Sequence, residues 1–164
     1  MGQKDFEAIY ETYYDRIYKY VYSILLHKED AEDVTAETFV AAYANFHRYD
    51  EQKASVATWL TRIAHNQAIN LVRSAYWKKR SEMPDNLEAK GGEDFAEHAA
   101  DEATIHQLYR LLSPEEREFL NFRYAMDMKD REIAQLLGLN EKTINKRYQR
   151  LLARCRELLE RKID

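Results

Sequence analysis

The chain has 164 residues, of which 45% are hydrophobic and 33% charged, and its formal net charge is -4. This length and composition suffice for one core of ordinary size or two small ones, and we favour two small helical domains. Four Gly and two Pro are few, and apolar residues recur at spacings of three and four rather than two. The sequence therefore predicts an all-α protein and gives little support to strands.

Cysteine usage and hydropathy argue against a secreted or membrane protein. The single Cys155 cannot form an intramolecular disulfide, and neither a signal peptide nor an apolar run long enough to cross a bilayer is present. We therefore expect a cytoplasmic protein without membrane insertion. We also expect no cofactor and no bound metal.

Charge is distributed unevenly along the chain. Basic and acidic residues balance at 11 each in residues 1–80, whereas residues 81–102 hold one basic against eight acidic residues, and residues 103–164 hold 13 against 10. The negative net charge argues against a protein that coats nucleic acid without sequence specificity. The middle segment also contains Pro84, Gly91 and Gly92, so we expect a flexible acidic linker at 81–102 between domains at 1–80 and 103–164.

Apolar side chains follow a helical period from Lys4 to Leu26, which predicts a first core helix. Half of the twelve tyrosines lie in it, and their rings suggest either base stacking or a packed core. The core is favoured, because a Tyr ring buries a large area while its hydroxyl reaches water at the edge. These tyrosines are Tyr10, Tyr13, Tyr14, Tyr18, Tyr20 and Tyr22.

A second helix is expected from Glu29 to Phe46, and its first half is acidic. Spacings of three and four place Asp30, Asp33 and Glu37 on one face, although carboxylates in a first turn are also favoured by the helix dipole. A metal site with His27 is conceivable, but the paired Glu-x-x-His motifs of di-metal bundles are absent. A solvated acidic face for a basic partner is favoured.

The polar segment His47 to Ser55 predicts a structured loop, followed by a long third helix that Ser55 or Thr58 caps. The loop, the helix and its end at 76–80 combine cations with aromatic rings. Such a surface binds single-stranded DNA, because rings stack on unpaired bases while cations follow phosphates. A bundle helix with a solvated face is the alternative.

Two further helices are expected before the most informative stretch. Residues 103–112 form a short one, and Ser113, with Pro114 and Glu116 after it, has the pattern of a helix start. The core residues expected in that second helix are Phe119, Leu120, Phe122 and Tyr124.

Residues 130–150, reading DREIAQLLGLNEKTINKRYQR, predict a helix-turn-helix. An apolar stripe marks the first helix, whose expected cap is Asp130. Gly138 permits a left-handed turn, and Asn140 is a good cap for the second helix. The stripe consists of Ile133, Ala134, Leu136 and Leu137.

The second helix carries side chains suited to phosphate oxygens and base edges, with eight cations against three acids over residues 140–162. Tight αα-turns with Gly also occur in bundles that bind no DNA, but the coincidence of turn and basic face favours DNA recognition. We expect Arg147 near the bases, and Arg150 and Arg154 at the flanking backbone. The candidate DNA-binding residues are Lys142, Thr143, Asn145, Lys146, Arg147 and Arg150.

Two segments resemble the conserved domains of the extracytoplasmic-function sigma factors of bacterial RNA polymerase. Residues 6–73, with DAEDVTAETFVAAY and ATWLTRIAHN, resemble the first, and residues 111–159, with LLSPEEREFLNFRYAMDM and EIAQLLGLNEKTINKR, resemble the second. They occur in the right order and at the right separation. The resemblance implies a factor that binds core polymerase through its β′ clamp helices and β subunit, reads the minus 35 element and opens the minus 10 element of promoter DNA. The family often also uses an anti-sigma factor.

The resemblance also implies roles for particular residues. The polymerase-binding set is Asp30, Asp33, Glu37 and Phe39. The minus 10 set is Arg48, Tyr49, Lys53, Ser55, Trp59, Asn66, Asn70 and Arg73. The six residues of the second helix of the helix-turn-helix read the minus 35 element. Asn70 stands where relatives often carry Asp, and residues 54–57 lack the Phe common before the Trp-Leu pair, so the minus 10 preference is open.

For the acidic segment 81–102, the resemblance implies a path near the RNA exit channel with nucleic-acid mimicry by charge, and an inert tether is the alternative. Two other classes of protein compete with a sigma factor. One is a LuxR-like helix-turn-helix regulator that binds duplex DNA without polymerase. The other is a metal-dependent enzyme acting on nucleic acid. The sequence gives this class no support, because it contains no catalytic nucleophile paired with a general base, no Gly-rich phosphate loop and no Cys/His spacing typical of metal ligands.

Overall fold

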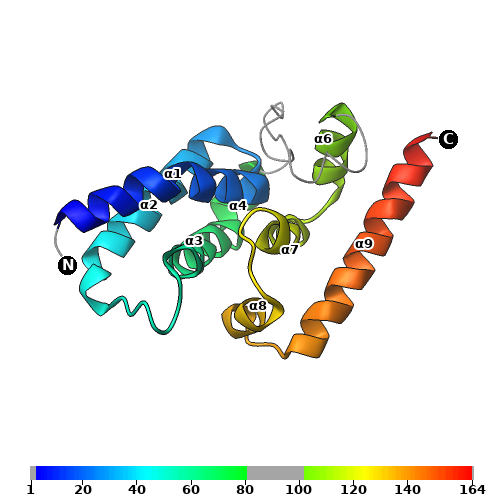
Figure 1. The fold of residues 1–164 in the computed structure, drawn as a ribbon. Helices are drawn as coiled ribbons and strands as arrows, with labels where there is room; N and C mark the ends of the chain where they lie inside the picture. Colours follow the sequence, from blue (N-terminus) through cyan, green and yellow to red (C-terminus); the bar gives the residue numbers. More distant parts are fainter. Residues whose placement is uncertain (1–2, 81–101, 164) are drawn as a thin grey trace. The chain divides into compact units, whose positions relative to one another are not determined.

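The computed structural model describes residues 3–80 and 102–163, and within them every regular element is a helix (Figure 1). The expected all-α fold is confirmed. The chain divides into two compact units, residues 1–87 and 88–164. The expected linker at 81–102 lies outside the described residues except for Glu102, which begins a helix.

The N-terminal unit is built on three packed helices, α1 (Gln3–Leu25), α2 (Lys28–Ala44) and α3 (Val56–Val72). Its core consists of fully buried side chains that each stabilise the fold by about 1.5–3 kcal/mol. Helical spacing places them on the inner faces of α1 and α3. They include Ile17, Tyr20, Val21, Ile24 and Leu60.

The tyrosines of α1 are only partly the core that the sequence predicts. Tyr20 is fully buried, whereas Tyr10 is 44% exposed. A separate ring cluster lies where α1 starts and α2 ends: the centroid of Phe6 is 6.5 Å from that of Phe39 and 5.5 Å from that of Phe46. Phe46 begins the short 3-10 helix η1 (Phe46–Arg48), so the cluster anchors the loop that follows α2.

The expected long third helix is in fact two helices. It ends at Val72, and α4 (Ala75–Arg80) starts anew because the Ser74 hydroxyl accepts a hydrogen bond from the Trp77 amide at 3.2 Å. Trp77 is buried edge-on against His27, with ring centroids 5.3 Å apart. The aromatic rings at 76–80 were one possible part of a DNA-binding surface, but the Trp77 ring belongs to the core instead.

The C-terminal unit contains α6 (Glu102–Leu111), α7 (Pro114–Tyr124), α8 (Asp130–Leu137) and α9 (Glu141–Ile163). The predicted start of α7 is confirmed: the Ser113 hydroxyl accepts from the Glu116 amide, and the Glu116 carboxylate accepts from the Ser113 amide. Phe119, Leu120 and Phe122 are buried as expected, but Tyr124 is 40% exposed.

A buried cation joins α6 to α7. The Arg117 guanidinium donates hydrogen bonds to the carbonyls of Tyr109, at 3.1 Å, and Leu112, at 2.5 Å. Tyr109 lies in the last turn of α6 and Leu112 just beyond its end, where carbonyls lack the amide partners of a continuing helix. Burial lowers the pKa of Arg117 to about 10.

Candidate nucleic-acid and partner interfaces

The turn between α8 and α9 has the geometry that the sequence predicts. Gly138 adopts φ +69, and the Leu139 amide donates to the Ala134 carbonyl at 2.9 Å, which closes the end of α8. No atom lies within 4 Å of a Cβ placed on Gly138, so its requirement is conformational rather than steric. The Asn140 side chain then caps α9 by accepting from the amide and the hydroxyl of Thr143.

The start of α8 differs from the expectation. The N-cap is Lys129 rather than Asp130, and the Lys129 amide donates to the Glu132 carboxylate at 3.1 Å. Asp130 is the first helical residue and forms an ion pair with Arg123 of α7. The carboxylate expected to cap α8 is therefore used to connect α8 to the preceding helix.

One face of α9 is buried in the unit and the opposite face is exposed. The buried row is Ile144, Tyr148, Leu151 and Cys155. Because an α-helix turns by roughly 100° per residue, Lys142, Lys146 and Gln149 lie opposite this row, with Asn145 and Arg150 on either side of them. All five are exposed. Gln149 was missed by the sequence interpretation, although its position relative to the buried row was available from helical spacing.

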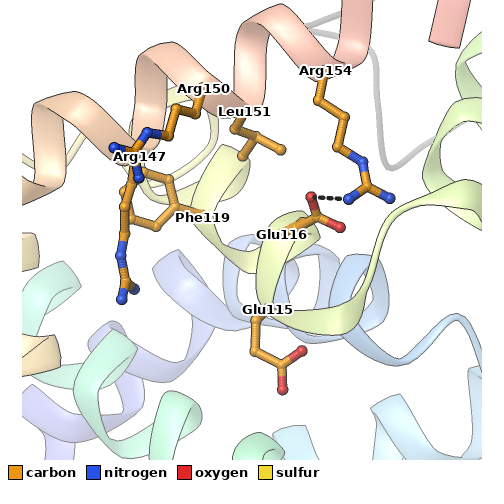
Figure 2. A pocket seen from close by; sticks show the side chains of 7 residues that line it. All are labelled: Glu115, Glu116, Phe119, Arg147, Arg150, Leu151 and Arg154. Carbon is orange, nitrogen blue, oxygen red and sulfur yellow. Dashed lines mark ion pairs between the residues drawn. The ribbon is translucent and has the colours of Figure 1, made fainter.

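The remaining candidates on α9 occupy its flank. Thr143 is half-buried and engaged by Asn140. Arg147 and Arg154 are exposed on the side of α9 that faces α7, where they line a pocket of about 350 Å³. Figure 2 shows Arg154 reaching Glu116, with 3.3 Å between the charged atoms, while Arg147 and Arg150 border the other end. Phe119 and Leu151 supply its apolar lining.

In the N-terminal unit, the expected acidic face of α2 is only partly exposed. Asp33 and Glu37 are exposed, but Asp30 is 6% and Phe39 4% exposed. Phe39 packs against the rings of Tyr10 and Tyr14, with centroids 5.0 and 5.8 Å away. Neither Asp30 nor Phe39 therefore lies on the surface as the sequence interpretation requires.

The exposed stripe of α2 continues beyond the carboxylates as an apolar patch. Val40 is 70% exposed and Tyr43 54% exposed, and helical spacing aligns them with Asp33 and Glu37. Neither Val40 nor Tyr43 was singled out from the sequence. Their unusual exposure was invisible there, because an apolar residue in an amphipathic helix is expected to face the core.

The loop between α2 and α3 is held by its own side chains. The Tyr49 hydroxyl donates to the Ala54 carbonyl at 2.9 Å, and the Tyr49 ring lies 4.7 Å from that of Trp59. Burial raises the pKa of Tyr49. The Ser55 hydroxyl accepts from the Thr58 amide, which settles Ser55 as the cap of α3. Arg48 and Lys53 are exposed on this loop.

The structure places the remaining minus 10 candidates on one exposed face of α3 or at its end. Asn66, Asn70 and Arg73 are all exposed, and their spacings of four and three put them in one row. Trp59 is half-buried beside the loop. The loop and this row belong to the same unit, as the sequence interpretation expects.

The described residues contain neither a metal-binding cluster nor a membrane-spanning helix. Within residues 3–80 and 102–163, no group of three or more His, Cys, Asp or Glu side chains is arranged to hold a metal ion. None of the helices in these ranges combines the length and apolar character needed to cross a bilayer.

Comparison with known families defines the class. Residues 9–78 match sigma-70 region 2 and residues 103–155 match sigma-70 region 4, so together these models cover about three quarters of the chain. The protein is therefore a sigma factor, which directs RNA polymerase to promoters and is not itself an enzyme. These matches favour this class over a LuxR-like regulator or a nucleic-acid enzyme.

The particular group follows from curated relatives. The chain is 29% identical over 161 residues to the ECF RNA polymerase sigma factor BldN of Streptomyces coelicolor, covering 93% of this chain and 61% of BldN. It is 28% identical to SigM and to SigW of Bacillus subtilis, covering 92% and 86% of those proteins and 94% and 91% of this chain. The chain belongs to the extracytoplasmic-function sigma factors.

Solved structures share the fold. The sigma factor RpoE of Bartonella quintana, in complex with the anti-sigma factor NepR, superposes with a TM-score of 0.76 at 21% identity, covering 96% of this chain and 98% of RpoE. CnrH, in complex with the cytosolic domain of CnrY, gives a TM-score of 0.69 at 22% identity, covering 97% of this chain and 90% of CnrH.

Proposed function

We propose that this sigma factor reads the minus 35 element through the outer face of α9, opens the minus 10 element through the loop and outer face of α3, and binds core polymerase through α2. The observation that carries the proposal is the outer face of α9. Cations and amides occupy it, directly opposite the buried row and immediately after a Gly-containing turn. This arrangement suits insertion into a major groove.

On α9, base reading is proposed for the residues that point farthest from the core. Lys142, Lys146 and Gln149 meet that condition, with Asn145 beside them, and an amide such as Gln149 can hydrogen-bond an adenine edge at two points. Arg147 and Arg150 border the pocket against α7, so we assign them to backbone phosphates. Thr143, held by Asn140, supports the helix start instead.

In the N-terminal unit, strand opening is proposed for the loop after α2. Extruding a base from the duplex costs a few kcal/mol. A loop that is already ordered adds no ordering cost of its own when it binds the extruded base. The Tyr49 hydrogen bond and the Tyr49–Trp59 ring contact preform this loop. Arg48 and Lys53 are placed to hold phosphates, and Asn66, Asn70 and Arg73 to follow the adjacent strand.

Core polymerase binding is proposed for Asp33 and Glu37, with the β′ clamp helices as partner. The apolar continuation at Val40 and Tyr43 supports this proposal, because an exposed apolar patch beside charges is typical of a protein interface. Asp30 and Phe39 act from the interior by shaping α2. The β subunit is the proposed partner of the C-terminal unit.

Two solved relatives support a proposal about regulation. RpoE is solved with the anti-sigma factor NepR, and CnrH with the cytosolic domain of CnrY. We propose that an anti-sigma factor likewise binds this chain, and that the chain works in the cytoplasm, where its polymerase is.

The experiment that tests the proposal is reconstituted transcription. The protein is mixed with core polymerase on a promoter library in which both elements are randomised, and enriched promoters are sequenced. We expect transcripts only with polymerase and this protein together, and enrichment at both elements. Permanganate footprinting of an enriched promoter should show an opened minus 10 region, and Tyr49→Phe should reduce that opening about two- to tenfold, since it removes one hydrogen bond from the loop. Transcription without enrichment at either element would contradict the proposal.

A further inference from the structure

Arg123 contacts two elements of the helix-turn-helix at once. From α7, its guanidinium forms an ion pair with Asp130, the first residue of α8. The same guanidinium lies over the ring of Tyr148 in α9, with its central carbon 4.1 Å from the ring centroid. One side chain therefore connects three consecutive helices.

Tyr148 is one of the residues through which α9 packs on α7. Its ring centroid is 6.2 Å from that of Phe119 and 6.3 Å from that of Tyr124, and the residue is 5% exposed. Tyr148 also belongs to the buried row of α9, so its position fixes which residues occupy the opposite, exposed face. A rotation or shift of α9 at Tyr148 moves Lys146 and Gln149, one turn or less away, directly.

We propose that Arg123 is a positioning residue for promoter recognition: it sets the orientation in which α9 presents its outer face to the minus 35 element. This inference rests on the proposed function of α9. The chemistry requires arginine, because a planar guanidinium can hold a carboxylate at its edge while its face stacks on an aromatic ring, and an ammonium cannot do both.

The contact is poorly suited to a purely stabilising role. The Arg123 and Asp130 side chains are 29% and 31% exposed, and ion pairs with that access to water contribute little to stability. The core under α8 and α9 is supplied separately by Ile133 and Ile144, which are fully buried. Loss of Arg123 should therefore leave the unit folded but α9 less firmly oriented.

Loss of orientation should affect base reading more than phosphate binding. Hydrogen bonds to a base edge need a defined position and direction, whereas a cation attracts a phosphate over a wider range. A variant with a loosened α9 should therefore lose discrimination between minus 35 sequences. A purely structural defect would lower the active fraction and reduce binding to all of them by one common factor.

The test compares holoenzymes that carry wild type, Arg123→Lys or Asp130→Asn. Affinities are measured for the minus 35 sequence that wild-type holoenzyme selects from a randomised library and for its single-base variants. We expect the ratio of preferred to variant affinity to fall at least about threefold in both substitutions, a size typical of coupling through neighbouring residues. Core binding and far-UV circular dichroism should be unchanged. Arg110→Lys, an exposed arginine on α6, is the matched control.

Two outcomes separate this inference from the proposal on which it rests. If wild-type holoenzyme discriminates between minus 35 sequences and both variants keep the same ratios, Arg123 does not position α9. If wild-type holoenzyme itself shows no minus 35 discrimination, base reading by α9 fails, and the positioning role fails with it.

Discussion

Arg117 illustrates how a single side chain can end one helix while belonging to the next. Its guanidinium binds the terminal carbonyls of α6 from a buried position in α7, where its own charge is costly. Arg117→Met should destabilise the C-terminal unit by about 2–4 kcal/mol, because two carbonyls lose charge-assisted hydrogen bonds. Both tryptophans, Trp59 and Trp77, lie in the N-terminal unit.

The tryptophans allow that prediction to be tested in the intact chain. In urea, Arg117→Met should move the far-UV circular dichroism transition to lower concentration while leaving the tryptophan fluorescence transition in place. The exposed Arg110→Met on α6 is the control and should move neither. An equal shift of both transitions, or none, would show that Arg117 does not act locally as a cap.

The conformation of Leu26 is a feature that the sequence does not predict. Leu26 adopts a left-handed conformation, φ 57, between α1 and α2, at a cost of roughly 1–2 kcal/mol for a side chain with a Cβ. Burial of Leu26, to 3% exposure, offsets that cost. Local preference predicts Gly or Asn at such a turn, so only the tertiary packing of Leu26 explains it.

At the scale of elements, helix starts were predictable wherever a side chain caps the backbone locally. Ser113 and Asn140 accept hydrogen bonds from amides three residues ahead, and that spacing is visible in the sequence. The start of α8 was missed because Asp130 is bound by Arg123, a contact between different helices. The break at Ser74 was missed because burying Trp77 requires a change of direction that periodicity alone does not specify.

The outer face of α9 gives a prediction about how base reading and phosphate binding are divided. Gln149→Ala should reduce discrimination at one minus 35 position by about 1–3 kcal/mol, since a base-edge contact is lost. Arg147→Ala should weaken binding to all minus 35 sequences and reduce the salt slope by about one unit, since a phosphate contact is lost. Holoenzyme affinities on single-base variants at several salt concentrations measure both effects. A change of base ranking in Arg147→Ala would instead place Arg147 in the groove, as sequence reasoning alone expects.

At the scale of the whole molecule, the sequence predicted the all-helical fold and its two units, because both follow from periodicity and composition. It could not predict which residues of the candidate interfaces are exposed. Asp30 lies at the edge of the α2 stripe and turns inward, and Phe39 joins a ring cluster that includes residues of α1. The exposed patch at Val40 and Tyr43 needs the packed unit to be recognised, since nothing local distinguishes these side chains from core.

The exposed carboxylates of α2 lead to a prediction about assembly with polymerase. Asp33→Lys and Glu37→Lys should each weaken core binding, because a favourable charge pair becomes a repulsion, whereas Asp30→Asn should leave core affinity unchanged, since that side chain is buried. Asp15→Lys, an exposed acid on α1, is the matched control. Titration of labelled protein with core polymerase at two salt concentrations measures the effect, which should shrink at the higher salt. If reversal at Asp15 weakened binding as much as reversal at Asp33, net charge rather than the α2 face would determine core affinity.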